Sequence, residues 1–190
     1  MKSTNYSRFC RKFLSGFFEK FDINETNKEK LLEKANIPMV YKEYYSMVIM
    51  NLFLGIIVSF ISTLIIYTLF PNTYTALLML IVSSVVPFGI AIYYISLPTA
   101  MAKSRGKKID KYLPYATNFI NTMSVAGISP AEIFEALSKI DLYDEVQKES
   151  KKITTEINMM GIDTITALNN AIKISPSDKF KEFIQGILSV

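Results

Sequence analysis

The chain has 190 residues, of which 50% are hydrophobic and 20% are charged, and its formal net charge is +4. It contains no His and a single Cys, Cys10, which excludes a Cys/His zinc site, a Ser-His-Asp or Cys-His catalytic arrangement and an internal disulfide. The sequence therefore predicts no enzyme activity, no cofactor and no metal. A sequence pI of about 9.0 would suit nucleic acid, but the basic excess lies beside apolar sequence, so anionic lipid is the expected counterpart and nucleic acid is not.

Residues 1–45 predict amphipathic helices on the cytoplasmic side of a membrane. Within residues 8–21, aromatic side chains fall on one helical face and basic side chains supply the charge. Two interpretations stay open for this helix, which either lies on the membrane surface or packs on its own protein. A second short helix is expected to begin at Thr26, where Glu29 completes a capping box, and to end near Pro38.

Between Tyr44 and Ala102 the chain has no Asp, Glu, Lys or Arg. A helix needs about 20 apolar residues to span a bilayer, because its backbone polar groups must pair within the segment. The uncharged stretch therefore predicts two transmembrane helices, residues 46–70 and residues 75–97, joined by an external turn at residues 71–74. The expected product is a transmembrane hairpin whose first helix is an uncleaved anchor.

Charges next to the two spans predict the topology. Lys42 precedes the first span, the turn carries no charge, and a basic group follows the second span: Lys103, Arg105, Lys107 and Lys108. By the positive-inside rule, both termini of the protein face the cytoplasm, on the inner side of the cell membrane. The basic group either holds this topology or contacts lipid or a partner protein.

Small residues in the first span predict close helix packing. They recur every four residues at Gly55, Ser59 and Thr63, and the second span has the same spacing at Ser83, Pro87 and Ala91. Such faces let two helices approach closely, so the two faces are expected to pack together. Asn51 is the most polar residue of the spans and fits either a hydrogen bond between helices or a transport path.

Residues 103–190 predict a cytoplasmic antiparallel bundle of short amphipathic helices, so the expected fold class is an all-α membrane protein. Gly127 and Gly161 are expected to end helices, whereas Ser129 and Asp163 are expected to begin them. The start signal recurs at residues 175–178. An acidic group, interpreted as the solvated start of a helix rather than as a metal site, consists of Asp141, Asp144, Glu145 and Glu149.

Three short motifs of this region follow one another in a recognisable order. A helix opens at Tyr112-Leu113-Pro114 and ends at Ser124-Val125-Ala126-Gly127; a Met160-Gly161-Ile162-Asp163 turn precedes Ala167-Leu168; and a Ser175-Pro176-Ser177 turn precedes Phe183. In this order the motifs resemble the type II secretion system F domain of platform proteins from archaeal type IV pili, archaella, tight-adherence systems and type II secretion. Residues 31–37 are similar to the segment before the first span of such proteins.

The resemblance implies a function in filament assembly. It implies an inner-membrane platform that couples a cytoplasmic assembly ATPase to the insertion of pilin-like subunits, and that binds further copies of itself within the lipid bilayer. A membrane-tethered helical adaptor and a transporter subunit remain alternatives. Because platform proteins continue beyond this point, residues 103–190 are expected to be an incomplete domain. The apolar face of the last helix is then expected to lack partners: Phe180, Phe183, Ile184, Ile187 and Leu188.

Overall fold

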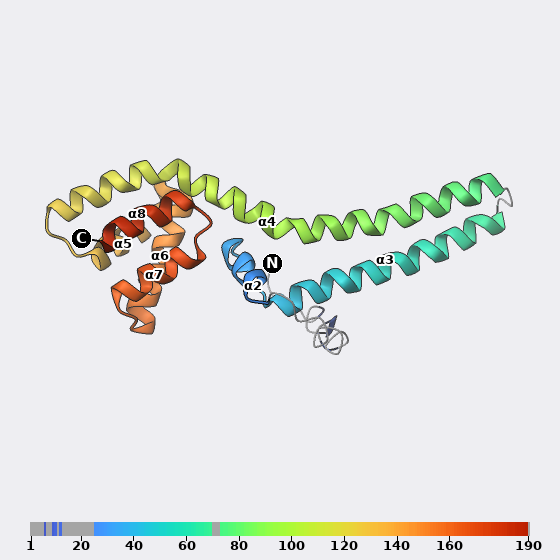
Figure 1. Cartoon of the computed structure of the whole chain (residues 1–190), viewed down its shortest axis with the longest axis horizontal. Helices are drawn as coiled ribbons and strands as arrows, with labels where there is room; N and C mark the ends of the chain where they lie inside the picture. The colour runs from blue at the N-terminus through green and yellow to red at the C-terminus, as the bar shows by residue number, and fades with distance from the viewer. Residues whose placement is uncertain (1–5, 7–8, 11, 13–24, 70–72, 190) are drawn as a thin grey trace. The chain divides into compact units, whose positions relative to one another are not determined.

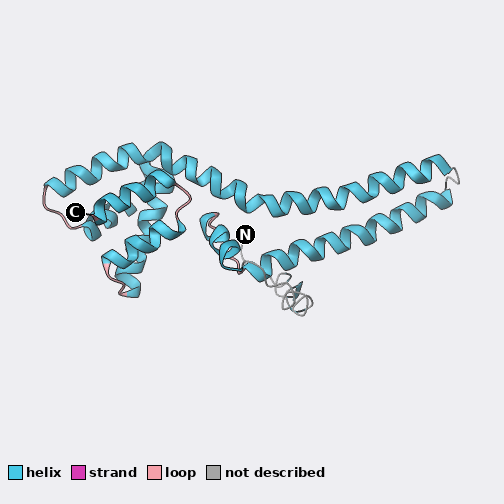
Figure 2. Ribbon diagram, in the orientation of Figure 1, coloured by secondary structure: helices cyan, strands magenta, loops and turns pink. Residues whose placement is uncertain are grey.

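The computed structural model describes residues 6, 9, 10, 12, 25–69 and 73–189. Throughout this described part the secondary structure is helical and contains no strand, as Figure 2 shows, so the all-α prediction is confirmed. Most of the amphipathic helix predicted over residues 8–21 lies outside the described residues, as do residues 71 and 72 of the predicted external turn. Thr73 and Tyr74 of that turn belong to a helix instead.

The described helices form two compact units, residues 1–99 and residues 100–190, and Figure 1 shows their order along the chain. Their bounds are α2 Glu25–Lys34, α3 Tyr41–Leu69, α4 Thr73–Val125, α5 Pro130–Ser138, the 3₁₀ helix η1 Asp141–Tyr143, α6 Asp144–Met160, α7 Thr164–Ile174 and α8 Asp178–Leu188. The helix α4 contributes residues to both units.

Helices α3 and α4 contain stretches that are long and apolar enough to cross a membrane, Tyr41–Ile65 and Val85–Val125. Only 6% and 17% of their most apolar windows are buried within the protein, whereas the core helix of a soluble protein is mostly buried. Most residues of these two windows are therefore exposed on the protein, as a membrane-spanning segment requires.

The second predicted span does not end as a separate helix. We expected one helix over residues 75–97 and another opening near Pro114, but α4 runs without a break from Thr73 to Val125. Pro98 and Pro114 each remove one backbone donor and neither is followed by a glycine or a turn sequence, so the helix continues through both.

Two contacts describe how α3 packs on the first part of α4 within the first unit. A Cβ atom added at Gly55 would lie 3.1 Å from Cβ of Pro87, and the Tyr44 hydroxyl donates a hydrogen bond of 2.7 Å to the carbonyl oxygen of Tyr94. Tyr44 precedes Gly55 in α3, whereas its partner Tyr94 follows Pro87 in α4. The two segments therefore lie side by side with opposite chain directions (Figure 1).

The second unit has its own hydrophobic core, built from α5 to α8 and the last part of α4. Its fully buried large side chains include Ile109 of α4, Phe134 of α5, Ile153 of α6, Leu168 of α7 and Phe180 of α8. Burial of each such side chain stabilises the fold by roughly 1.5–3 kcal/mol. We call residues 100–190 the bundle.

The expectation that the apolar face of α8 lacks partners is wrong. Phe180 and Ile184 are 1% and 0% exposed within the core cluster, and Phe183, Ile187 and Leu188 pack against it. Sequence periodicity identified the face, but the partners come from distant helices, which periodicity does not identify.

Most predicted helix ends of the bundle are confirmed. Ser129 and Glu132 form a reciprocal capping box at the start of α5, and the side chains of Asp163 and Ser177 accept from backbone N–H groups at the starts of α7 and α8. Gly161 adopts the left-handed conformation, with φ of 67°, and ends α6. Upstream, α2 begins at Glu25, so Thr26 lies inside the helix rather than at its N-cap.

A matched pair of substitutions tests the burial of α8. Ile184→Ala removes a side chain that is 0% exposed and should lower the free energy of unfolding by about 2–5 kcal/mol, because it loses apolar contacts and leaves a cavity. Ile165→Ala, at a helix position 64% exposed, should change it by less than about 0.5 kcal/mol. Denaturant unfolding of the full chain in detergent micelles measures both. Equal effects would show that the face of α8 is not packed.

Candidate functional site

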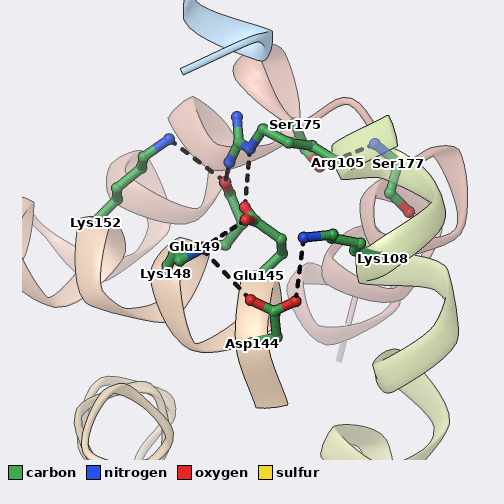
Figure 3. Close-up of polar contacts among 9 residues, drawn as sticks. All are labelled: Arg105, Lys108, Asp144, Glu145, Lys148, Glu149, Lys152, Ser175 and Ser177. Atoms are coloured by element: carbon green, nitrogen blue, oxygen red, sulfur yellow. Dashed lines mark hydrogen bonds and ion pairs between the residues drawn. The ribbon is translucent and has the colours of Figure 1, made fainter. Parts of the chain in front are cut away.

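A buried ion-pair cluster, formed by Arg105 of α4 and by Glu145 and Glu149 of α6, joins the two helices inside the bundle (Figure 3). Arg105 Nε donates to Glu145 Oε2 at 2.9 Å, and Arg105 Nη2 donates to Glu149 Oε1. The side chains are 10%, 7% and 1% exposed, respectively. The planar guanidinium can pair with two carboxylates at once, which a lysine cannot do with the same geometry.

Lysines at the rim of the cluster complete its charge balance. Lys148 Nζ lies 2.6 Å from Glu145 Oε1, and Lys152 Nζ lies 3.4 Å from Glu149 Oε1, as Figure 3 shows. Lys148 also reaches Asp144 at 3.4 Å, and Lys108 of α4 reaches the same carboxylate at 3.7 Å. Each buried carboxylate therefore has the arginine on its inner side and a lysine on the side toward solvent.

These contacts decide the ionisation of Glu145. Burial alone would raise the pKa of this carboxyl, but the hydrogen bonds from Lys148 and Arg105 outweigh burial and leave the pKa below its ordinary value. The same contact raises the pKa of Lys148, chiefly through its hydrogen bond to Glu145. Glu145 and Lys148 are therefore both charged at neutral pH.

A second set of polar contacts holds the loop between α7 and α8 against α4. The Ser177 hydroxyl donates to Asp110 Oδ1 and accepts from the backbone N–H of Phe180, while the backbone N–H of Ser177 donates to Ser175 Oγ. Ser175 and Ser177 are 0% and 2% exposed. The hydroxyl that caps α8 thus also connects this loop to α4.

Gly106 makes this close approach possible. A Cβ atom at Gly106 would lie 2.8 Å from the carbonyl oxygen of Pro176, a separation that a side chain and a backbone oxygen do not tolerate. The glycine therefore fits the loop against α4, one residue after Arg105.

The basic group predicted from the sequence divides into two kinds of residue. Lys103 and Lys107 are exposed, and the Lys108 side chain is 54% exposed. Arg105 is buried and paired, so its assignment as a lipid or partner contact is corrected: its guanidinium holds the bundle together. Helix periodicity explains the difference, because Arg105 lies one turn before the core residue Ile109.

The acidic group also requires a correction. Asp141 is exposed and Asp144 is partly exposed, as a solvated helix start requires, but Glu145 and Glu149 are buried against Arg105. Glu145 and Glu149 are four residues apart and so lie on one face of the helix, which is the feature of the sequence that could have indicated a shared partner. Their partner lies 40 and 44 residues away, which no local pattern indicates.

The predicted helix-packing residues lie on α3 in the first unit. Gly55, from the small-residue face predicted in the first span, lies against Pro87, from the face predicted in the second span. Ser59 and Thr63 are partly buried, and the Thr63 hydroxyl donates to the Ser59 carbonyl oxygen at 2.9 Å. Asn51, one of the exposed residues of α3, accepts a hydrogen bond of 2.8 Å from Tyr6.

The chemistry available at the cluster is structural. Among residues 6, 9, 10, 12, 25–69 and 73–189, no group of three His, Cys, Asp or Glu residues could hold a metal ion. The carboxylates of the cluster are occupied by cations of the chain itself. The arrangement can transmit force between α4 and α6, since pulling them apart would separate buried opposite charges.

Comparison with known proteins gives one similarity of limited extent. An uncharacterized protein of Methanocaldococcus jannaschii is 37% identical over 92 residues, which is 48% of this chain and 16% of that protein. The match thus spans a small part of the relative. No protein-family model and no solved structure matches the chain.

Removal of the arginine should destabilise the bundle strongly. Arg105→Ala leaves two buried carboxylates without their inner partner and should lower the free energy of unfolding by about 3–5 kcal/mol. Lys107→Ala, two residues along the same helix but exposed, should change it by less than about 0.5 kcal/mol. Thermal unfolding of the full chain, monitored by circular dichroism, compares the two. Similar melting curves would contradict the structural role of Arg105.

Two glycines in helices of the bundle should respond in opposite directions to alanine. Gly106→Ala introduces a clash with the Pro176 backbone and should cost about 1–3 kcal/mol, partly offset by better helix propensity. Gly186→Ala meets nothing within 4 Å and should stabilise the protein by about 0.5–1 kcal/mol. The same denaturant unfolding measures both, and stabilisation by Gly106→Ala would show that the loop does not lie against α4.

Proposed function

We propose that the chain is a membrane platform of a type IV pilus-like or type II secretion-like filament system, which couples a cytoplasmic ATPase to the insertion of pilin-like subunits. The main support is α4, which runs unbroken from a candidate membrane span into the bundle and is fixed there by the buried ion-pair cluster. A continuous helix with a fixed end transmits displacement along its axis. A platform without a nucleotide site of its own needs such an element.

The motifs of the resemblance support the same proposal. Gly127, Gly161 and Asp163 all lie at helix ends, and the Ser175-Pro176-Ser177 turn is the buried loop against α4. Helix ends and close approaches between backbones restrict which residues can stand at a position. The motifs of the resemblance therefore lie at positions where the residue type affects the fold.

In this proposal α3 and the first part of α4 form a transmembrane hairpin in the cell membrane, with both termini and the bundle in the cytoplasm. Exposed Lys103 and Lys107 lie beside anionic headgroups or the ATPase, and further copies of the chain associate within the membrane. The energy for assembly comes from the ATPase in this proposal.

Topology is the first test. Reporters fused at residue 1 and after Val190 should both give a cytoplasmic signal, and a reporter inserted between Asn72 and Thr73 should give an external one, because the basic residues flank the spans on one side. Alkaline phosphatase and fluorescent-protein fusions make the measurement in cells. An external signal at either terminus would overturn the proposed orientation.

Deletion of the gene tests the filament function. The proposal predicts loss of surface filaments in electron micrographs while pilin precursors remain in the membrane, and co-purification of the complete protein with a hexameric assembly ATPase. Complementation with Lys103→Glu and Lys107→Glu, which leave the ion-pair cluster intact, then tests the exposed basic residues separately from bundle stability. Normal filaments in the deletion strain would contradict the platform function and favour a membrane-tethered adaptor.

A further inference from the structure

Helix α4 has three internal prolines, and their surroundings differ. Pro87 packs on Gly55 of α3, and Pro114 lies between the buried core residues Leu113 and Ala116. Pro98 lies at the end of the first unit, which closes at Thr99. It is thus the proline at which α4 passes from one compact unit to the next.

The backbone at Pro98 lacks a hydrogen bond that the rest of the helix has. In an α-helix the N–H of residue i donates to the carbonyl of residue i−4. Pro98 has no N–H, so the carbonyl of Tyr94 receives no hydrogen bond from the helix backbone at that position. The carbonyl of Tyr94 is the group to which the Tyr44 hydroxyl donates, at 2.7 Å. Tyr44 is 1% exposed. A side chain of α3 therefore satisfies the carbonyl that the proline leaves open.

On both sides of Pro98, α4 is fixed to other elements. Four residues before it, Tyr94 is bound by Tyr44 of α3; seven residues after it, Arg105 is bound by Glu145 and Glu149 of α6. Between Pro98 and Arg105, every residue except Ala102 is exposed. Pro98 itself is buried. The segment in which few side-chain contacts resist bending therefore runs from residue 99 to residue 104, between two ends that are held.

We propose that α4 bends at Pro98 and that the Tyr44 hydroxyl is the latch of this hinge. When the Tyr44–Tyr94 bond is made, the open carbonyl is satisfied and the helix holds one angle. When the bond breaks, the carbonyl turns to water or headgroups and the angle of α4 changes. The inference concerns bending of this chain alone and stands or fails independently of the proposed filament function.

Double electron–electron resonance on the full chain in lipid nanodiscs tests the hinge. In a Cys10→Ser background, spin labels are placed on Val85→Cys and Met159→Cys, at positions that are 63% and 82% exposed. Pro98→Ala restores the missing donor and should narrow the distance distribution between the labels. Tyr44→Phe removes the latch and should broaden the distribution or shift its mean.

Two controls separate bending from loss of fold. Pro114→Ala restores a donor inside the bundle and should leave the distribution between residues 85 and 159 unchanged. A label pair on Lys139→Cys and Met159→Cys, both in the bundle, should give the same narrow distribution in every variant. If Pro98→Ala leaves the distance distribution between residues 85 and 159 unchanged, α4 does not bend at Pro98. If Tyr44→Phe leaves that distribution unchanged, the Tyr44 hydroxyl does not control the bend. Equal narrowing by Pro114→Ala would also overturn the assignment to Pro98.

Discussion

The bundle depends on one guanidinium group that faces two carboxylates where little water reaches them. A buried charge is costly unless an opposite charge and hydrogen bonds replace its hydration, and Arg105, Glu145 and Glu149 replace it for one another. The pairing fixes the rotation of α4 about its axis, because the helix must direct residue 105 toward α6. That rotation in turn places Ile109, Leu113 and Ala116 in the core and Gly106 against the loop before α8.

Proline has a different consequence in each part of α4. In the bundle the core holds the helix on both sides of Pro114, so loss of one backbone bond changes little. Pro98 is itself buried, but residues 99–101 after it are exposed, and a tyrosine from α3 donates the hydrogen bond that the backbone cannot supply. A helix with one weakened point between two fixed segments can bend at that point while each segment keeps its own contacts.

Local features of the fold were predictable from the sequence, whereas long-range pairing was not. The absence of charge from Tyr44 to Ala102 predicted the apolar helices, and Ser129, Gly161, Asp163 and Ser177 predicted helix ends, because caps depend on residues within one turn. The burial of Arg105 and of the α8 face depends on residues far away in the chain. The continuity of α4 was missed because a proline was taken as a helix start.

The most direct test of this account is a double-mutant cycle between Arg105 and Glu149, with Arg105→Met, Glu149→Leu and the combined variant measured by denaturant unfolding of the full chain. Arg105→Met leaves Glu145 and Glu149 buried without the arginine, whereas Glu149→Leu leaves Arg105 paired with Glu145 alone. The combined substitution removes the charges of the Arg105–Glu149 pair and leaves Glu145 paired with Lys148. The account predicts that the combined variant loses less free energy of unfolding than the sum of the two single losses, with a coupling of about 2–3 kcal/mol. Additive losses, with no coupling between the two positions, would contradict the claim that this pair fixes α4 in the bundle.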